Sequence, residues 1–377
     1  MMFNPINTRT ISYLERWFAP ILKRLPPKLA IEIYSKGRKE FLKILEKEAP
    51  SETYSPPENL SRTLWGIKFN SPIMNSAGMF KNGGFYDLVV KQGAGGYLGG
   101  TTTWNERDGN TKENIHLPFV PYRDSHSASN WLGLPNDGDS INSWRAKKIV
   151  EKRVEGVPIG WSLMASSDLD RESKLIYLVK SMFLYTQAGV DFIEINESCP
   201  NTERTKSQDS TLEDRLKYIK ENFLDKRQRR LPVIVKFSND TSLEQVPELL
   251  DLLFELGYDG VNFGNTSTNY KKRRIGISPS ETKLYDFFTN TFGGGVSGRP
   301  LRESSLELCT KAVQHLKERD PKQDFHVIRT GGIETAEDIR QSEEAGIKLN
   351  QWFTGYFDNF ALHGHNLYRE LYKSLSL

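Results

Sequence analysis

The chain has 377 residues, about the length of two average domains, although one α/β barrel can use most of that length. A formal net charge of +3 argues against a nucleic-acid binder. Only two cysteines, Cys199 and Cys309, stand far apart, which disfavours a disulfide framework and favours a reducing compartment. No apolar run reaches the ~18 residues of a spanning helix, the N-terminus lacks a signal peptide's apolar core, and the histidines show no metal-ligand spacing.

Residues 1–57 predict a helical hairpin followed by a linker. Apolar residues recur at helical spacing over Ser12–Leu25, and Pro26-Pro27 ends that helix. A second apolar run, Leu29–Leu45, follows among many lysines and arginines. Two interpretations stay open. The hairpin is a cap that packs on the main domain, or it is an interfacial membrane module, because aromatic and aliphatic faces with basic rims suit anionic bilayers.

Residues 58–377 repeat a pattern of strand, loop and helix. The expected strands are Pro72–Asn75, Gly96–Gly99, Pro158–Met164, Phe192–Ile195, Val233–Phe237, Gly260–Phe263, His326–Arg329 and Asn350–Phe353. The expected helices between them include Leu175–Gln187, Leu243–Leu256, Ser304–Lys317 and Ala336–Ala345. Several strands are near-continuous apolar runs, as in parallel sheets covered on both faces. The pattern predicts an α/β fold, a (β/α)8 TIM barrel with an N-terminal helical extension, with a doubly wound sheet as the alternative.

Polar residues cluster directly after these strands. In a barrel they all lie on the rim at the carboxyl ends of the strands, where active sites lie. They are Asn75, Thr101–Thr103, Asn196, Lys236, Asn265, Gly331-Gly332 and Thr354-Gly355.

One of these clusters, Asn196–Thr202, sets the thiol of Cys199 between the amides of Asn196 and Asn201. A cysteine so placed can take a proton from a substrate whose polar edge the amides hold. The alternative is a buried cysteine in a strand-to-helix turn, with Asn and Pro present for turn geometry.

The late part of the chain predicts a phosphate site. Gly293–Gly298 can bring backbone N–H groups close to an anion, and Thr330–Gly332 and Thr354-Gly355 follow the seventh and eighth strands. Loops at these two positions commonly hold phosphate in a barrel, and Arg329 can add positive charge. Lys236 ends a buried strand, where it either extends to the rim or meets an anion inside the site.

Residues 60–362 resemble the FMN-containing dihydroorotate dehydrogenases along nearly their whole length. The matching motifs are Ala77-Gly78 with Lys81-Asn82-Gly83, Thr103 with Gly109-Asn110, Asn130–Asn136, Asn196–Thr202, Val235-Lys236, Asn265-Thr266, Gly294–Leu301, Gly331–Ile333 and Thr354-Gly355. The hairpin at residues 11–47 is also similar to the N-terminal extension of the membrane-associated, quinone-linked branch.

The resemblance implies oxidation of dihydroorotate to orotate in de novo pyrimidine biosynthesis, with FMN as cofactor, hydride transfer to flavin N5 and a quinone as second acceptor. It implies Cys199 as the base that removes the C5 proton. The substrate-binding residues that it implies are Lys81, Asn130, Asn196, Asn201, Asn265 and Thr266. The cofactor-binding residues are Ala77, Gly78, Thr101, Ser162, Asn196, Lys236, Gly295, Ser297, Gly298, Gly331, Gly332, Thr354 and Gly355. It further implies peripheral attachment to the cytoplasmic face of a membrane.

The chain departs from the family's pattern at four places. Cys199 stands where the quinone-linked branch usually has serine, and Asn130–Asn136 looks more like the fumarate-linked branch. Ser162 stands where the family usually has asparagine, and Glu197 adds a carboxylate next to the base. Fumarate or another acceptor, a different dihydropyrimidine, and a non-enzymatic barrel that binds a phosphorylated ligand remain the alternatives.

Overall fold

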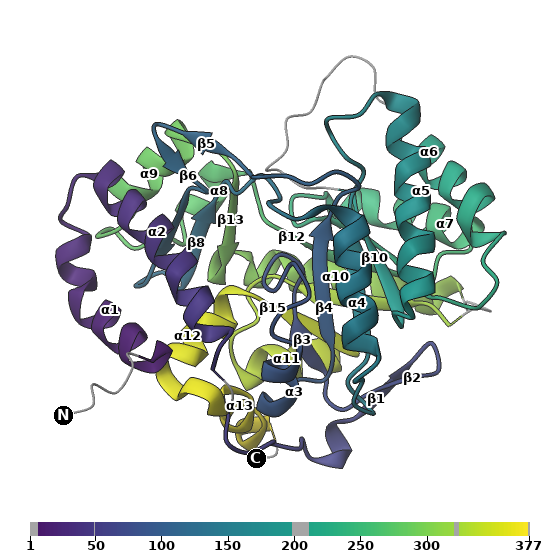
Figure 1. The fold of residues 1–377 in the computed structure, drawn as a ribbon, viewed down its shortest axis with the longest axis horizontal. Helices are drawn as coiled ribbons and strands as arrows, with labels where there is room; N and C mark the ends of the chain where they lie inside the picture. Colours follow the sequence, from purple (N-terminus) through teal and green to yellow (C-terminus); the bar gives the residue numbers. More distant parts are fainter. Residues whose placement is uncertain (1–6, 49, 198–210, 320–323, 376–377) are drawn as a thin grey trace.

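The computed structural model describes residues 7–48, 50–197, 211–319 and 324–375. Its centre is one sheet of eight parallel strands in which neighbours in sequence pair side by side (Figure 1). These strands are β3 (Ile73–Asn75), β4 (Tyr97–Thr102), β9 (Ile159–Leu163), β10 (Phe192–Asn196), β11 (Val233–Ser238), β12 (Gly260–Asn265), β14 (His326–Thr330) and β15 (Leu349–Trp352). All eight predicted strands and the predicted barrel are confirmed.

The barrel closes between β3 and β4 partly through a side chain. The Asn75 amide Nδ2 donates to the Leu98 carbonyl at 2.7 Å, and its Oδ1 accepts from the Leu98 N–H at 3.2 Å. The Gly95 N–H donates to the Ile73 carbonyl at 2.9 Å. Asn75, which we expected on the rim, is therefore fully buried as a bridge between the first and last strands of the sheet order.

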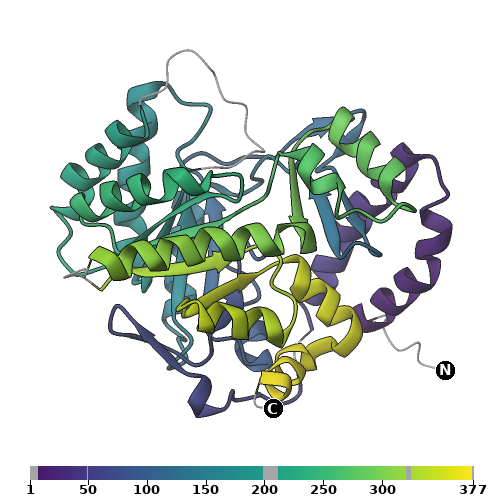
Figure 2. The same cartoon turned by 180° about the vertical axis from the view of Figure 1, so that it is seen from behind.

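Helices surround the sheet, with α10 and α11 prominent from behind (Figure 2). They are α3 (Tyr86–Gln92), α4 (Gly138–Val150), α5 (Arg171–Ala188), α6 (Leu212–Ile219), α7 (Val246–Glu255), α10 (Arg302–Arg319), α11 (Ala336–Glu344), α12 (Thr354–His363) and α13 (Leu367–Leu375). The largest apolar cluster lies between these helices and the outward faces of the strands. This layering is what near-continuous apolar strands predict.

The inside of the barrel changes from apolar to polar along its axis. Trp65 and Phe69, from the hairpin of β1 (Arg62–Leu64) and β2 (Ile67–Phe69), close the amino end. They pack on an interior layer from six strands: Met74, Leu98, Phe192, Ile234, Ile328 and Leu349. Inward positions recur every two residues along a strand. The next inward layer therefore contains Glu194, Lys236, Thr330 and Gln351, which makes the carboxyl end polar.

A group of short strands and helices that projects from the barrel, here called the excursion, supports the N-terminal helices. It comprises β5 (Thr111–Lys112), β6 (Ile115–His116), β7 (Phe119–Tyr122), β8 (Ser127–Asn130), β13 (Gly295–Gly298), α8 (Tyr270–Arg274) and α9 (Thr282–Thr291). The predicted hairpin is present as α1 (Thr8–Leu22) and α2 (Pro27–Leu45). It lies at the side of the molecule away from α5, α6 and α7 (Figures 1 and 2). Ala30 and Ile31 of α2 are buried in the core of the excursion.

The first helix packs differently from the second. Only Thr8, Ser12 and Ala19 of α1 are buried, and Pro20 lies within it. Its large apolar side chains instead face solvent: Tyr13, Leu14, Trp17, Phe18 and Ile21, with Trp17 72% exposed. We call these five residues the α1 apolar face. The packing of α2 fits the cap interpretation, whereas the α1 face is what an interfacial module requires. In the described part of the chain, no helix is both long and apolar enough to span a bilayer.

Candidate active site

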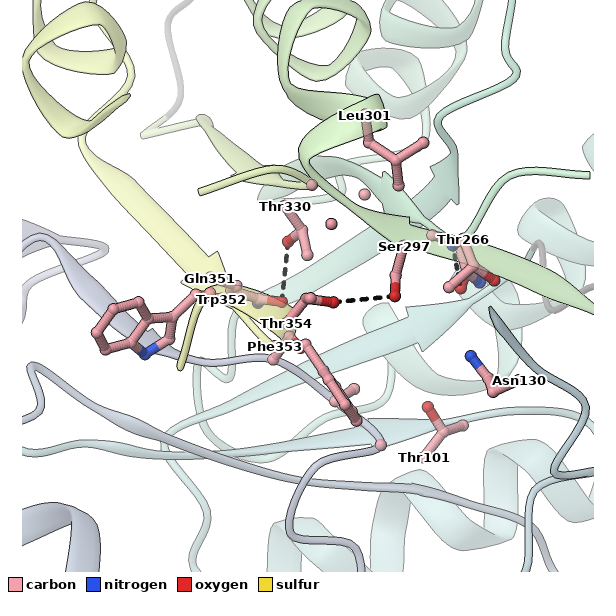
Figure 3. Close-up of a pocket in the computed structure, with 18 of the residues that line it drawn as sticks. Thr101, Asn130, Thr266, Ser297, Leu301, Thr330, Gln351, Trp352, Phe353 and Thr354 are labelled. Carbon is pink, nitrogen blue, oxygen red and sulfur yellow. Dashed lines mark hydrogen bonds between the residues drawn. The ribbon is translucent and has the colours of Figure 1, made fainter. Parts of the chain in front are cut away.

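A cavity opens at the carboxyl ends of the barrel strands, where the interior is polar. It encloses about 1000 Å³, part of which is open to solvent at the mouth. Its walls come from seven barrel strands or the loops after them, from β8 and β13, and from Arg38 of α2. Figure 3 shows side chains from separate elements, among them Thr101, Asn130 and Ser297, gathered around the cavity.

The cavity brings together most of the residues that the sequence singled out. Those that line it are Ala77, Gly78, Lys81, Thr101, Asn130, Asn196, Lys236, Asn265, Thr266, Ser297, Gly298, Gly331, Gly332, Thr354 and Gly355. Cys199 and Asn201 lie outside the described residues. The described residues stop at Glu197 and begin again at Thr211. Strand β10 ends at Asn196, which lines the cavity and precedes Cys199 by three positions in the sequence.

Two expected cofactor contacts, Ser162 and Gly295, are not among the lining residues. Ser162 on β9 is fully buried and shares a 2.9 Å hydrogen bond with the hydroxyl of Thr101, which does line the cavity. Gly295 belongs to β13, where it pairs with Asn130 of β8. The glycine-rich loop expected at this point is therefore partly a strand, and Ser297 and Gly298 at its far end line the cavity.

One side of the cavity is built from backbone that lies too close to its neighbours for side chains. A Cβ on Gly355 would lie 2.1 Å from the Ile333 carbonyl oxygen, and one on Gly332 would lie 2.4 Å from the Arg302 Cα. Helix α12 begins here at Thr354 without a side-chain cap, so its first N–H groups have no intrahelical partners. The Ser297 and Thr354 hydroxyls share a 2.9 Å hydrogen bond at the same place (Figure 3). Uncapped N–H groups and hydroxyls suit a phosphate.

Arg329 does not contribute to this phosphate side. Its guanidinium is fully buried and donates to the Ser305 hydroxyl at 3.0 Å, to the Asp338 carbonyl at 3.0 Å and to the Arg302 carbonyl at 2.9 Å. These bonds tie β14 to α10 and α11. The expectation that Arg329 adds charge to the cavity is wrong, because the side chain points outward into the helix layer.

Amides form a connected row along another wall. The Asn265 Nδ2 donates to the Asn196 Oδ1 at 2.9 Å, and the Asn196 Nδ2 donates to the Thr101 hydroxyl at 3.4 Å. The Thr266 N–H donates to the Asn265 Oδ1 at 3.0 Å, which fixes the orientation of that amide. Asn130 also lines the cavity (Figure 3). Side-chain amides offer donor and acceptor together, as an imide edge requires.

The cavity is electropositive. Lys81, Lys236 and Arg38 line it, and no described carboxylate does. Lys236 is almost fully buried, with its Nζ 3.4 Å from the Glu194 Oε1. The Arg38 guanidinium lies 5.5 Å from the Phe119 ring centre, and burial lowers the pKa of Arg38 to about 10, so it is still charged at neutral pH. Such a lining favours anionic ligands.

Glu197 forms an ion pair with Arg215 and is therefore not available as a second base. Its carboxylate Oε2 accepts from the Arg215 Nε at 2.9 Å and Nη2 at 2.8 Å. The guanidinium, which donates twice to one carboxylate oxygen, compensates the carboxylate charge. On its own that charge would raise the pKa of a neighbouring thiol.

Sequence reasoning missed Arg38, Gln351 and Glu194. Arg38 was one of many basic residues on a predicted amphipathic helix, and only the docking of α2 on β7 brings it to the cavity. Gln351 and Glu194 are polar residues inside apolar strands, with exposures of 0% and 1%. That position was the available signal, because a buried polar side chain requires partners.

The fold and the cavity define a (β/α)8 barrel with closely packed glycines, an uncapped helix start and an amide-lined, electropositive site at the carboxyl ends of its strands. The family model for dihydroorotate dehydrogenase matches residues 59–375, and the chain belongs to this family of flavin-dependent oxidoreductases, which oxidise dihydroorotate.

Two similar proteins are named dihydroorotate dehydrogenase (quinone). The one from Arthrobacter is 29% identical over 85% of this chain and 86% of its own. The one from Pectobacterium atrosepticum is 29% identical over 82% and 85%. Two crystal structures of DHODH from Eimeria tenella share the fold. The complex with ferulenol aligns with a TM-score of 0.71 at 20% identity, covering 93% of this chain and 91% of the other. The ligand-free form gives 0.72 at 22% identity, covering 89% and 91%.

Proposed function

We propose that this protein oxidises dihydroorotate to orotate in de novo pyrimidine biosynthesis, with FMN as cofactor and a quinone as second acceptor. The observation that carries the proposal is the cavity itself. It combines a phosphate cradle, a row of amides and three cations, with no described carboxylate in its lining. The names of the similar proteins support the quinone as acceptor.

The residues present fit FMN. The uncapped start of α12, with Gly331, Gly332 and Ser297, would hold the phosphate, because crowded glycines let backbone N–H groups approach an anion. Ala77, Gly78 and Thr101 would contact the ring, and the Lys236 ammonium would favour its anionic reduced form. When bound, the flavin accepts the hydride that leaves substrate C6.

The amides and Cys199 divide the work on the substrate. Asn130, Asn196, Asn201 and Asn265, with Thr266 and Lys81, would hold the pyrimidine ring and its carboxylate, since amides match an imide edge and a cation pairs with a carboxylate. Cys199 would take the proton from C5 as the C5–C6 double bond forms. A thiol with an ordinary pKa near ~8.5 becomes a working base once neighbouring positive charge lowers its pKa. The electropositive cavity provides that charge.

The hairpin supplies the features that favour a quinone over a soluble acceptor. Arg38 brings α2 into the cavity wall, so a ligand between the hairpin and the barrel would reach the site from the α2 side. The α1 apolar face on the same hairpin would lie at the boundary between headgroups and acyl chains of a bilayer. Quinones dissolve in the acyl layer of the same bilayer. We propose peripheral attachment at the cytoplasmic face of a membrane on these grounds.

Turnover of the purified holoprotein tests the proposal. Dihydroorotate is supplied with a short-chain ubiquinone, with fumarate or with NAD, and ubiquinone should give the fastest turnover. Equal or faster turnover with fumarate would overturn the quinone assignment. Colourless protein that cannot be reconstituted with FMN would support a non-enzymatic barrel instead.

Arg38→Ala separates the two half-reactions. It should slow reoxidation by quinone while leaving flavin reduction by dihydroorotate unchanged, because Arg38 comes from the hairpin side of the cavity. Lys36→Ala is the matched control on the same helix, since Lys36 is exposed and paired with Glu32. Equal effects of both substitutions would remove the proposed role of Arg38.

A further inference from the structure

Glu194 is a carboxylate buried inside the barrel directly below the cavity. It lies on β10 two residues after Phe192, in the polar layer above the apolar interior layer. Its side chain is 1% exposed. A carboxylate buried to this extent is costly unless it is paired and hydrogen-bonded. Its partners therefore indicate why the chain keeps it.

The partners of Glu194 come from three neighbouring positions in the same polar layer. Its Oε2 accepts from the Asn262 Nδ2 at 2.8 Å and from the Gln351 Nε2 at 3.0 Å. Its Oε1 accepts no hydrogen bond from the described residues, and the Lys236 Nζ lies 3.4 Å away. The carboxylate is thus anchored on one oxygen and presents the other to the lysine.

The same network reaches the cavity wall. The Thr330 hydroxyl lies 3.1 Å from the Gln351 Oε1 (Figure 3). It also lies 3.0 Å from the Asn262 Oδ1, so its one O–H can donate to either amide oxygen. Thr330, Gln351 and Lys236 all line the cavity, whereas Glu194 and Asn262 lie beneath it. Two amides and a hydroxyl therefore hold the Glu194 carboxylate in one orientation, and the carboxylate acts on the cavity through Lys236.

The pairing decides the charge at the cavity floor. An ammonium and a carboxylate sum to zero, so the pair of Lys236 and Glu194 balances the charge that a lone buried cation would place there. The attraction of a lone cation for an anion would be stronger in this poorly hydrated interior than in water.

We propose that Glu194 is a positioning residue that fixes the ammonium of Lys236 and moderates its charge, so that the reduced anionic cofactor is not held too strongly to pass its electrons on. This inference rests on the proposed function. In this role Glu194, which lies outside the cavity, adjusts the reduction potential of the cofactor.

The test uses FMN-loaded protein and measures sulfite affinity by loss of flavin absorbance, together with the flavin midpoint potential. Sulfite is an anionic probe of positive charge beside the ring. Glu194→Gln keeps the shape but removes the charge, so it should bind sulfite at least tenfold more tightly and raise the potential. A tenfold preference for the reduced form corresponds to about 30 mV for a two-electron couple.

Two further variants close the cycle. Lys236→Met leaves the carboxylate alone and should shift both quantities in the opposite direction, while the double variant Glu194→Gln/Lys236→Met should return close to wild type. Asp139→Asn is the control, because Asp139 is a buried carboxylate of the helix layer whose partners are Ser181 and Tyr185.

The outcomes are distinguishable. Glu194→Gln with normal FMN content but wild-type sulfite affinity and potential would overturn the inference and leave the proposed function intact. If Glu194→Gln fails to retain FMN, rescue by the double variant supports the pairing, and a loss without rescue overturns it. Wild-type protein that binds no FMN would overturn the proposed function itself.

Discussion

The α1 apolar face allows a quantitative prediction of membrane affinity. Trp17 is 72% exposed and Ile21 57% exposed. Burying a large apolar side chain contributes about 1.5–3 kcal/mol when it moves fully out of water. Scaling by these exposures gives about 2 kcal/mol for Trp17 and about 1 kcal/mol for Ile21. Trp17→Ser/Ile21→Ser should therefore weaken vesicle binding by about 3 kcal/mol, roughly 100-fold.

Co-sedimentation with phosphatidylcholine vesicles containing phosphatidylglycerol measures this loss. The matched control is Trp144→Ser/Ile141→Ser on α4, where the same residue types are 60% and 47% exposed. The control should bind vesicles like wild type, and both variants should keep their bound FMN. A change below threefold in the α1 variant, or equal losses in the two variants, would refute the assignment of the α1 face to the bilayer.

Three further predictions concern the site and the fold. Cys199→Ala should keep bound FMN but lose flavin reduction by dihydroorotate, measured by stopped-flow absorbance. The control Cys309→Ala should show normal flavin reduction, because Cys309 is buried and burial raises its pKa to about 12. Flavin reduction at the wild-type rate in Cys199→Ala would exclude Cys199 as the base. Gly355→Ala should lose the preference for FMN over riboflavin, because the added Cβ would collide with the backbone at the phosphate side. Gly37→Ala, with no atom near its Cβ, should bind both flavins like wild type. A Gly355→Ala variant that still prefers FMN would contradict the phosphate cradle. Carboxylate partners raise the pKa of His126 to about 9. Its contribution to stability is therefore complete below about pH 6.5 and is lost as the pH rises through about 9. Thermal melts of His126→Gln should lack this alkaline loss of stability, and identical pH profiles for the variant and wild type would contradict the prediction.

The barrel was predictable because its strands carry their own signal. Runs such as Val233–Val235 are apolar on both faces, and the spacing between runs leaves room for one helix each. The position of polar residues after the strands then placed Asn196, Asn265 and Thr354 at one end of the barrel. Chain order in a parallel barrel fixes spatial order, so local motifs sufficed for this part of the site.

What the sequence left out depends on long-range packing. Arg38 reaches the cavity only because Ala30 and Ile31 of α2 are buried against the excursion, which no local pattern specifies. Arg329 looked like a cavity cation, but its inward or outward direction depends on the strand's register. The buried pairing of Glu194 with Lys236 joins two neighbouring strands and likewise follows from tertiary structure.

We propose that this cavity passes electrons from dihydroorotate to a quinone through bound FMN. Anaerobic half-reactions of the purified holoprotein test it most directly. Dihydroorotate should bleach the flavin absorbance, and a short-chain ubiquinone should restore it faster than fumarate does. A flavin that dihydroorotate leaves oxidised, or one that fumarate restores as fast as ubiquinone, would contradict the account.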